Sequence, residues 1–230
     1  MKKYTTLLFD ADRTLFDFDA AERDAFGIVM SAHGIQLDNG DFERYVRIND
    51  GLWEQLGRGE ITKEYLLDNR FGLFFDAIGK KVDVSSALLN AEYVDELADV
   101  SKLFDGAEEF CRELSKHYEM YIVTNGVSHT QKKRFYLSRI HEYFKDIFVS
   151  EDAGAAKPMR EYFDYVFERI GEDKRRSSVI VGDSLPHDIL GGINAGIDTV
   201  WYNPKGACNT TDITPTKTVT SYTELLEMLL

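Results

Sequence analysis

The sequence predicts an α/β protein in which a doubly wound, Rossmann-like parallel sheet is interrupted near its start by an all-helical domain. From residue 104 onward, short apolar runs typical of buried strands alternate with helical segments, the pattern of a parallel sheet with right-handed crossovers. Between the first apolar run and residue 100, apolar residues instead recur at three- and four-residue intervals. We therefore expect an α/β core domain formed by residues 1–16 and 101–230, and a helical domain formed by residues 17–100.

The first apolar run, Leu7-Leu8-Phe9, is short and stops abruptly at two acids, Asp10 and Asp12. Consecutive apolar side chains are typical of a strand that is buried on both faces. Open α/β sheets place their ligand sites beyond the carboxyl ends of such strands, and two Asp side chains there repel each other unless a cation or a shared proton intervenes. Acids that cap the start of a helix would explain the same pair, so the rest of the chain must distinguish a cap from a ligand site.

Residues 17–100 are expected to form about four helices. Apolar periodicity places them at residues 19–32, 42–56, 65–78 and 88–100, with glycines in the turns between them. The aromatic cluster at residues 71–75 is interpreted as the core of this bundle, because large aromatic side chains are mostly buried; a ring that stacks on a substrate is the alternative.

From residue 104 the alternation of helices and strands returns. Strands are expected at residues 118–123, 147–149, 178–181 and 199–202, and helices at residues 105–116, 128–139, 158–170, 186–195 and 221–230. Pro158 suits the first turn of its helix, and the basic run Lys132-Lys133-Arg134 is interpreted as a solvated helix face. Residues 203–218, rich in Thr, Asn and Pro, are expected to form a surface loop.

Polar residues follow each of the first four predicted strands. They are Asp10 and Asp12, Thr124 and Asn125, Lys157, and Asp183. Because the carboxyl ends of parallel strands share one edge of the sheet, we expect these side chains to converge. Together they offer a carboxylate nucleophile, a second acid, a hydroxyl group, a cation and a further carboxylate. This set suits phosphoryl transfer assisted by Mg²⁺, which prefers oxygen ligands and is usually held by one or two carboxylates and a substrate phosphate.

The 230-residue chain carries 27 Lys and Arg against 40 Asp and Glu, a formal net charge of −13. Nucleic acid polymers and anionic membranes require a basic surface, so neither is expected as the main partner. No apolar run approaches the ~18 residues of a membrane span. Cys111 and Cys208 form no C-x-x-C motif, which favours a cytoplasmic protein with reduced thiols. No sequence pattern specifies an oligomeric state.

Taken in order, these groups resemble the motifs of the haloacid dehalogenase-like (HAD) superfamily of hydrolases, and the resemblance covers essentially the whole chain. The matching segments are Asp10-Ala11-Asp12-Arg13-Thr14 for the first motif, Thr124-Asn125 for the second, Lys157-Pro158 for the third, and Gly182-Asp183-Ser184 with Asp188 for the fourth. The helical domain matches the cap domain of this superfamily in its commonest position. Residues 10–18 are most similar to the branch of pyrimidine 5′-nucleotidases.

The resemblance implies a role for each catalytic residue. Asp10 would attack phosphorus and form an aspartyl-phosphate, which splits one difficult displacement into two. Asp12 would protonate the leaving oxygen and then deprotonate the attacking water. Thr124 and the backbone N–H of Asn125 would hold the phosphoryl oxygens, and Lys157 would balance the negative charge.

The resemblance also implies a Mg²⁺ site. Asp10 and Asp183 would bind the ion through their carboxylates, and Asp12 through its backbone carbonyl. Asp188 is expected to orient these ligands rather than to bind the ion, and an acid favoured by the positive end of a helix is its alternative explanation. Arg13 departs from the family, which often has Gly at this position. Its side chain either points away from the site or narrows its mouth, which affects the size of the leaving group more than the chemistry.

The implied activity is that of a Mg²⁺-dependent phosphomonoester hydrolase for a small phosphorylated metabolite, with a pyrimidine nucleoside monophosphate as the expected substrate. A phosphatase for a sugar phosphate is the first alternative. A 2-haloacid dehalogenase would not need Asp12, and a catalytically silent binding protein is expected to have lost one of the catalytic residues, all of which are present. A phosphonate hydrolase would need a lysine in an apolar setting in the cap, and none of the candidates has one: Lys63, Lys80, Lys81 and Lys102.

Overall fold

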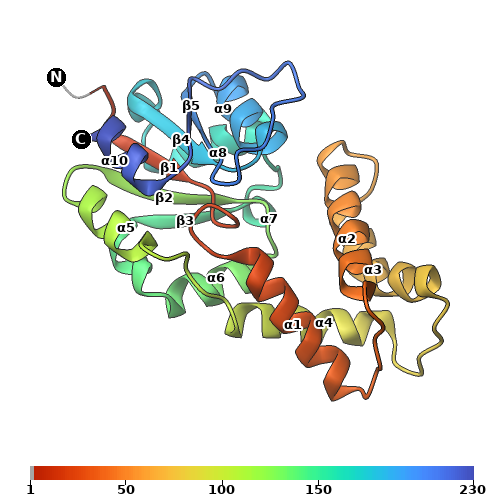
Figure 1. Ribbon diagram of the computed structural model, residues 1–230. Coiled ribbons are helices and arrows are strands. Elements are labelled where there is room, and N and C mark those ends of the chain that lie inside the picture. Colours follow the sequence, from red (N-terminus) through yellow and green to blue (C-terminus); the bar gives the residue numbers. More distant parts are fainter. Residues whose placement is uncertain (1–2) are drawn as a thin grey trace. The chain divides into compact units, whose positions relative to one another are not determined.

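The computed structural model describes residues 3–230, and the chain divides into two compact units (Figure 1). The core unit comprises residues 1–18 and 102–230, and the helical unit comprises residues 19–101. The two units are described separately below.

The core unit is built on a six-stranded sheet with the order β3-β2-β1-β4-β5-β6, in which every neighbouring pair is parallel. The strands are β1 (Thr6–Phe9), β2 (Glu119–Thr124), β3 (Asp146–Val149), β4 (Ser178–Gly182), β5 (Asp198–Tyr202) and β6 (Lys217–Val219). β1 lies at the centre, between β2 and β4. This order confirms the predicted doubly wound α/β fold and places the ends of β1, β2 and β4 side by side.

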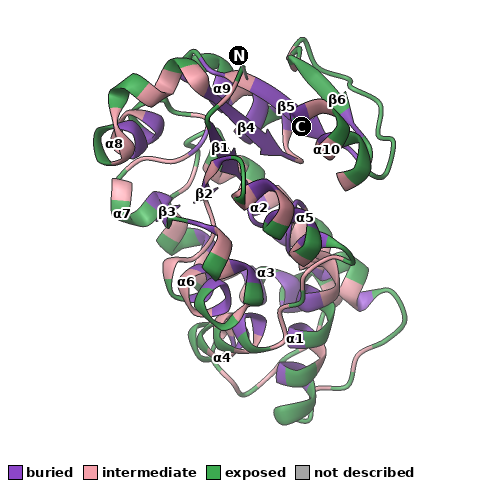
Figure 2. Cartoon of the chain, turned by 90° about the vertical axis from the view of Figure 1, so that its left-hand side faces the viewer, coloured by how far each residue is buried: buried purple, intermediate pink, exposed green. Residues whose placement is uncertain are grey.

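Both faces of the sheet are buried, which explains the consecutive apolar residues of its strands. Leu7 and Phe9 point to one face and pack with Phe110, whereas Leu8 points to the other face and packs with Phe163. Alternate residues of a strand point to opposite faces, so each central strand needs apolar side chains at every position. Figure 2 shows the buried residues concentrated along the strands and on the sides of the helices that cover them.

Helices of the core unit cover the two faces of this sheet. One face packs against residues of α5 (Ala107–Ser115), α6 (Ser128–Leu137), η1 (Arg139–Tyr143) and α10 (Tyr222–Leu229). The other face packs against residues of α8 (Arg160–Ile170) and α9 (Leu190–Ala195). Short connecting elements complete the unit: α7 (Ser150–Ala153), η2 (Glu172–Ser177) and the π-helical turn η3 (Leu185–Ile189).

Two expectations for the secondary-structure elements of this unit were wrong in detail. Helix α8 begins at Arg160 rather than at Pro158, which lies in the preceding turn, where the Met159 N–H donates to the Ala156 carbonyl. Residues 217–219, at the end of the expected loop, form the edge strand β6. Reciprocal hydrogen bonds between Thr199 and Thr216, each from a backbone N–H to the other hydroxyl, precede this strand and fix it beside β5.

The helical unit contains α1 (Phe18–Ala32), α2 (Asp41–Gly57), α3 (Lys63–Ile78) and α4 (Ser86–Asp99), close to the expected segments. The Thr62 and Ser85 hydroxyls cap α3 and α4 by accepting hydrogen bonds from backbone N–H groups. Phe26, Tyr45 and Phe71 are fully buried with their rings within 6.4 Å of one another. The aromatic residues of α3 therefore include core residues of this unit, as expected.

Polar side chains are also buried in the helical unit. The Asn49 amide donates to the Glu22 carboxylate at 2.8 Å, and the Tyr93 hydroxyl donates to the same oxygen at 3.5 Å. The Arg70 guanidinium lies 4.4 Å from the centre of the Tyr93 ring. Each of these four residues is at most 2% exposed. Such a network stabilises one arrangement of helices, because each buried polar group needs its partner.

The chain passes from the core unit into the helical unit and back at two adjacent points. Phe16 and Leu103 form an antiparallel bridge, and the Asp17 N–H donates to the Lys102 carbonyl at 2.9 Å. The Phe104 N–H donates to the Leu15 carbonyl at 3.0 Å. These residues all belong to the core unit, which therefore holds both connections together.

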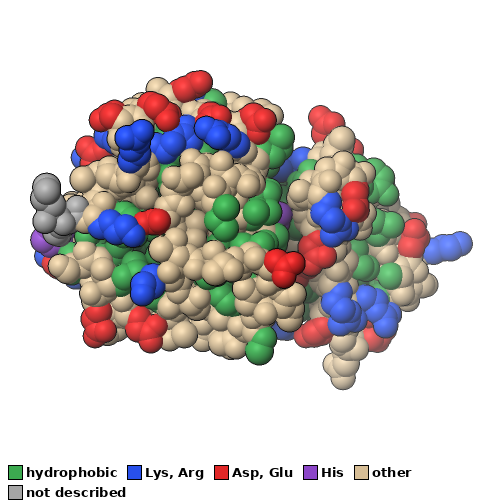
Figure 3. Space-filling view, turned by 90° about the horizontal axis from the view of Figure 1, so that it is seen from above, with side chains coloured by type: hydrophobic (Ala, Val, Ile, Leu, Met, Phe, Trp, Pro, Cys, Tyr) green, Lys and Arg blue, Asp and Glu red, His purple; other side chains and the backbone are tan. Residues whose placement is uncertain are grey.

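The surface carries charges of both signs. On the face shown in Figure 3, Lys and Arg side chains lie among Asp and Glu side chains. Across residues 3–230, no helix combines the length and the apolar character needed to cross a bilayer.

Candidate active site

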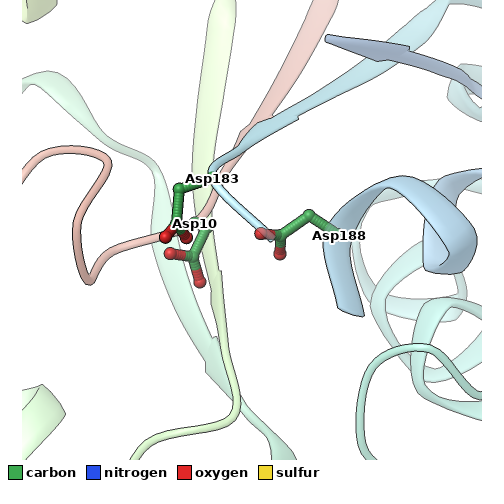
Figure 4. A group of neighbouring side chains, drawn as sticks. All are labelled: Asp10, Asp183 and Asp188. Atoms are coloured by element: carbon green, nitrogen blue, oxygen red, sulfur yellow. The ribbon is translucent and has the colours of Figure 1, made fainter. Parts of the chain in front are cut away.

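Three carboxylates converge beyond the ends of β1 and β4. Asp10 follows β1 directly, Asp183 follows β4, and Asp188 lies in the turn η3. Phe9 is paired with Val181, and the Asp10 N–H continues the ladder by donating to the Val181 carbonyl at 2.9 Å. One oxygen from each carboxylate lies within 4.8 Å of the others, and Figure 4 shows the three side chains pointing toward a common space.

Lys157 supplies the positive charge of this cluster. Its ammonium group donates to Asp10 Oδ1 at 2.5 Å, to Asp188 Oδ1 at 2.7 Å and to the Val123 carbonyl at 2.8 Å. Asn125 fixes the lysine backbone, because its side-chain amide accepts from the Lys157 N–H and donates to the Lys157 carbonyl. The loop after β2 thereby sets the position of the cation next to Asp10.

Burial and charge shift the pKa values of these groups. Burial raises the pKa of Asp10 to about 7; Lys157 opposes this shift, and Asp188 adds to it. Burial also raises the pKa of Asp183 well above its ordinary value, and the neighbouring Asp10 raises it further. Burial lowers the pKa of Lys157, but the carboxylates of Asp10 and Asp188 outweigh this effect and hold it above its ordinary value. The lysine is therefore charged, and the raised pKa values of Asp10 and Asp183 show that a further cation is needed to favour their ionised forms.

The donor set fits a hard divalent cation. Asp10, Asp183 and Asp188 present only carboxylate oxygens, the ligands that Mg²⁺ prefers, and a single lysine does not neutralise three acids. Both oxygens of Asp188 already accept hydrogen bonds from protein groups: Oδ1 from the Lys157 ammonium and Oδ2 from the Ser184 N–H. Asp10 and Asp183 are consequently better placed to give oxygens to a metal.

Thr124 and Asn125 lie at the end of β2, on the same edge of the sheet. The Thr124 hydroxyl accepts from the Gly126 N–H at 3.1 Å, while its own N–H donates to the buried Tyr162 hydroxyl. Tyr162 in turn donates to the Phe148 carbonyl at 2.7 Å. Tyr162 thus ties the ends of β2 and β3 together, a role that its position on the buried side of the amphipathic helix α8 does not predict.

Asp12 is not one of the three clustered carboxylates, and its side chain is held by α6 instead. Its Oδ2 accepts from the Gln131 amide at 2.7 Å, and its Oδ1 lies 2.5 Å from Nη2 of Arg134. Arg134 is 2% exposed, so its interpretation as part of a solvated basic face is wrong. A spacing of three residues places Gln131 and Arg134 on the buried side of α6, next to the buried side chain of Phe135. That spacing, on a helix that directly follows a motif loop, is the signal that could have identified them.

Two further residues shape the loop after β1. Thr14 is fully buried, and its hydroxyl lies 3.5 Å from Asp10 Oδ2. Arg13 has a φ of 59°, the only positive φ at a non-glycine residue among residues 3–230. This backbone conformation favours glycine, which gives a physical reason why the family often has glycine at the position of Arg13. The Arg13 guanidinium lies 5.1 Å from the centre of the Phe18 ring and lowers the pKa of Asp183, opposing the effect of burial.

Comparisons with known proteins bear on the family to which this chain belongs. The haloacid dehalogenase-like hydrolase family model matches residues 4–196. The crystal structure of YfnB from Bacillus subtilis bound to magnesium superposes with a TM-score of 0.93, at 43% identity over 99% of both chains.

Two nucleotidases align over nearly the whole chain. The pyrimidine 5′-nucleotidase PynA of Streptococcus pneumoniae (strain ATCC BAA-255 / R6) is 36% identical over 98% of this chain and 95% of its own length. The pyrimidine 5′-nucleotidase YjjG of Escherichia coli (strain K12) is 32% identical over 99% of this chain and 98% of its own length. The chain belongs to the haloacid dehalogenase-like hydrolase family.

Proposed function

We propose that this protein is a Mg²⁺-dependent phosphomonoester hydrolase that acts through an aspartyl-phosphate on Asp10. The observation that carries the proposal is the buried Asp10 carboxylate, which is paired with Lys157 at 2.5 Å and faces Asp183 and Asp188 at the open end of the sheet. A nucleophile held at a strand end beside a fixed cation suits the attack on a phosphorus atom that carries negative charge.

Each residue of the site has a separate role in the proposed reaction. Lys157 orients Asp10 and offsets the charge of an incoming phosphate, and the Thr124 hydroxyl lies on the same edge to hold a phosphoryl oxygen. Asp12 supplies the proton to the leaving oxygen and later removes one from the attacking water. Asp10 and Asp183, with the backbone carbonyl of Asp12, are the groups that would hold Mg²⁺. When bound, that ion supplies the positive charge that a dianionic phosphate needs opposite these carboxylates.

For the substrate, we propose a pyrimidine nucleoside 5′-monophosphate. The support is the similarity to PynA and YjjG, both named pyrimidine 5′-nucleotidases, which extends over nearly the whole chain. We assign the selection of the leaving group to the helical unit. Within α3, Phe71 and Phe74 are fully buried and serve as core, whereas Tyr65 is 45% exposed and is the better candidate for stacking on a base.

A side-by-side measurement of kcat/KM tests the proposal. The substrates are dUMP, dAMP and glucose 6-phosphate, each with Mg²⁺ and with excess chelator, and 2-chloropropionate serves as the dehalogenase substrate. We expect phosphate release that requires Mg²⁺ and is fastest with dUMP. A clear preference for the hexose phosphate would contradict the nucleotidase assignment and leave the phosphatase chemistry in place. Chloride release without phosphate release would contradict both.

A further inference from the structure

Asp12 is held by two buried residues of α6 that no motif assigns to the reaction. Gln131 is 3% exposed and Arg134 is 2% exposed, whereas the Asp12 side chain is 26% exposed. The contacts form a closed triangle. Gln131 donates to Asp12 Oδ2 at 2.7 Å, Arg134 donates to Gln131 Oε1 at 2.7 Å, and Arg134 Nη2 lies 2.5 Å from Asp12 Oδ1. Both oxygens of Asp12 are therefore in contact with buried groups.

The burial of Arg134 is costly unless it serves the carboxylate. Its Nε and Nη1 atoms are buried without a hydrogen-bond partner, and Asp12 is its one ion-pair partner among residues 3–230. The guanidinium carbon lies 4.5 Å from the centre of the Phe16 ring, which fixes the plane of the group from one side. An arginine that served only to stabilise α6 would gain more at the surface, because a buried charge must be desolvated.

Gln131 is fixed just as tightly. A Cβ atom at Gly126 would lie 2.0 Å from Gln131 Nε2, so the amide occupies space that only glycine leaves open. Gly126 lies in the loop that begins at the end of β2, directly after Thr124 and Asn125. The loop that we propose to hold the phosphate therefore also sets the position of the amide that contacts Asp12.

We infer that Gln131 and Arg134 are positioning residues that hold the Asp12 carboxylate in the orientation for proton transfer with the leaving group and the attacking water. The inference rests on the proposed function, because only a reaction that uses Asp12 in this way would reveal it. Neither residue touches Asp10, Asp183 or Asp188 in the described contacts, so their removal should leave these three carboxylates in place.

Substrates with different leaving groups separate this role from a structural one. 4-Nitrophenolate leaves readily without a proton, whereas the 5′-alkoxide of a nucleoside requires one. Gln131→Met keeps the length of the side chain and removes its N–H donor. We expect it to lower kcat for dUMP about 10- to 100-fold and kcat for 4-nitrophenyl phosphate less than about threefold, with a smaller change in KM. Arg134→Met should show the same selective loss, and Arg134→Lys should restore part of it.

Two controls complete the experiment. Lys132→Met removes a neighbouring cation of α6 whose partner is Asp152 at 2.7 Å, and it should leave both rates unchanged. In an Asp12→Asn background, Gln131→Met should cause no further selective loss, because a positioning residue acts only through the group it positions.

The outcomes are distinguishable. An equal loss with both esters in a folded Gln131→Met protein, or an undiminished loss in the Asp12→Asn background, overturns the positioning role and leaves the proposed function standing. A parent protein that hydrolyses neither ester overturns the proposed function and this inference together. If Arg134→Met does not fold, Gln131→Met, which changes no charge, still tests the positioning role by itself.

Discussion

At the scale of single residues, the central feature is the proposed nucleophile, Asp10, a carboxylate that the fold both buries and pairs with a cation. Asp10 is 7% exposed and shares Lys157 with Asp188. Asp10→Asn keeps the shape of the side chain and removes its nucleophilic charge. We expect kcat to fall by at least about 10⁴-fold, because the loss of a covalent nucleophile typically costs several powers of ten.

Circular dichroism and thermal unfolding of the same sample should show an intact fold, since Lys157 keeps Asp188 as its partner. Activity of a folded Asp10→Asn protein within tenfold of the parent would remove Asp10 from its role.

The same cluster predicts how Mg²⁺ should stabilise the protein at different pH values. Burial raises the pKa of Asp10 from 3.8 to about 7, so the folded protein takes up a proton relative to the unfolded chain between these pH values. Without metal, the contribution of Asp10 to stability therefore falls as the pH rises from about 4 to about 7. The proposed Mg²⁺ site would use the ionised carboxylates, so the stabilising effect of the ion should grow over the same range.

Thermal unfolding with 10 mM added Mg²⁺ (roughly saturating for a weak carboxylate site) should raise Tm more at pH 8 than at pH 5.5. Asp183→Ala should reduce this rise and increase the Mg²⁺ concentration that activity requires. An equal rise at both pH values, or an unchanged rise in Asp183→Ala, would contradict the metal assignment.

At the scale of secondary-structure elements, the end of β4 is packed directly against η3. A Cβ atom at Gly182 would lie 2.3 Å from the Asp188 carboxylate carbon. Gly182→Ala should therefore displace Asp188 from Lys157 and lower both stability, by about 1–3 kcal/mol, and kcat. Gly27→Ala is the matched control, because Gly27 lies within α1 with nothing within 4 Å of its added Cβ.

Gly27→Ala is expected to stabilise the protein by about 0.5–1 kcal/mol without changing activity. Urea unfolding and kcat/KM measured on both variants check the pair. Parent-like stability and turnover in Gly182→Ala would show that the end of β4 has room to relax.

Packing between the helices of the helical unit makes a separate prediction. Glu22 is the buried acceptor for Asn49 and Tyr93, so Glu22→Ala leaves their donors without a carboxylate. We expect a loss of about 1–3 kcal/mol in the free energy of unfolding. Glu43→Ala is the control: Glu43 is 54% exposed, its contact with Arg23 is 3.5 Å long, and its removal should change stability by less than about 0.5 kcal/mol. Equal effects of the two substitutions, measured by urea unfolding, would assign no stabilising role to the buried network.

At the scale of the whole molecule, the sequence predicted the parallel sheet because its central strands are buried on both faces and carry apolar runs without interruption. It placed Asp10, Thr124 and Asp183 at strand ends because those runs stop at polar residues, whereas Lys157 lies farther along the chain, beyond β3 and α7. The strand β6 was missed because it is short, lies at the edge of the sheet and has two exposed residues, which leaves no apolar pattern.

The burial of Arg134 could not be predicted in the same way. Its neighbours Lys132 and Lys133 are basic, and local sequence does not reveal that Asp12, more than a hundred residues away, supplies the partner. Glu22 was hidden for the same reason, since its partners Asn49 and Tyr93 come from other helices. Polar residues that are buried with distant partners leave no periodic signal, whereas apolar strands do.

The bridge between Phe16 and Leu103 has a consequence for how such a protein can be altered by evolution or design. Because the Asp17 N–H and the Lys102 carbonyl are hydrogen-bonded, the core unit has its two open ends side by side, like the ends of a hairpin. A turn of about two residues would suffice to join them. The helical unit is therefore an insertion between two adjacent chain ends. Segments of other lengths and folds can replace it without shifting the register of any strand.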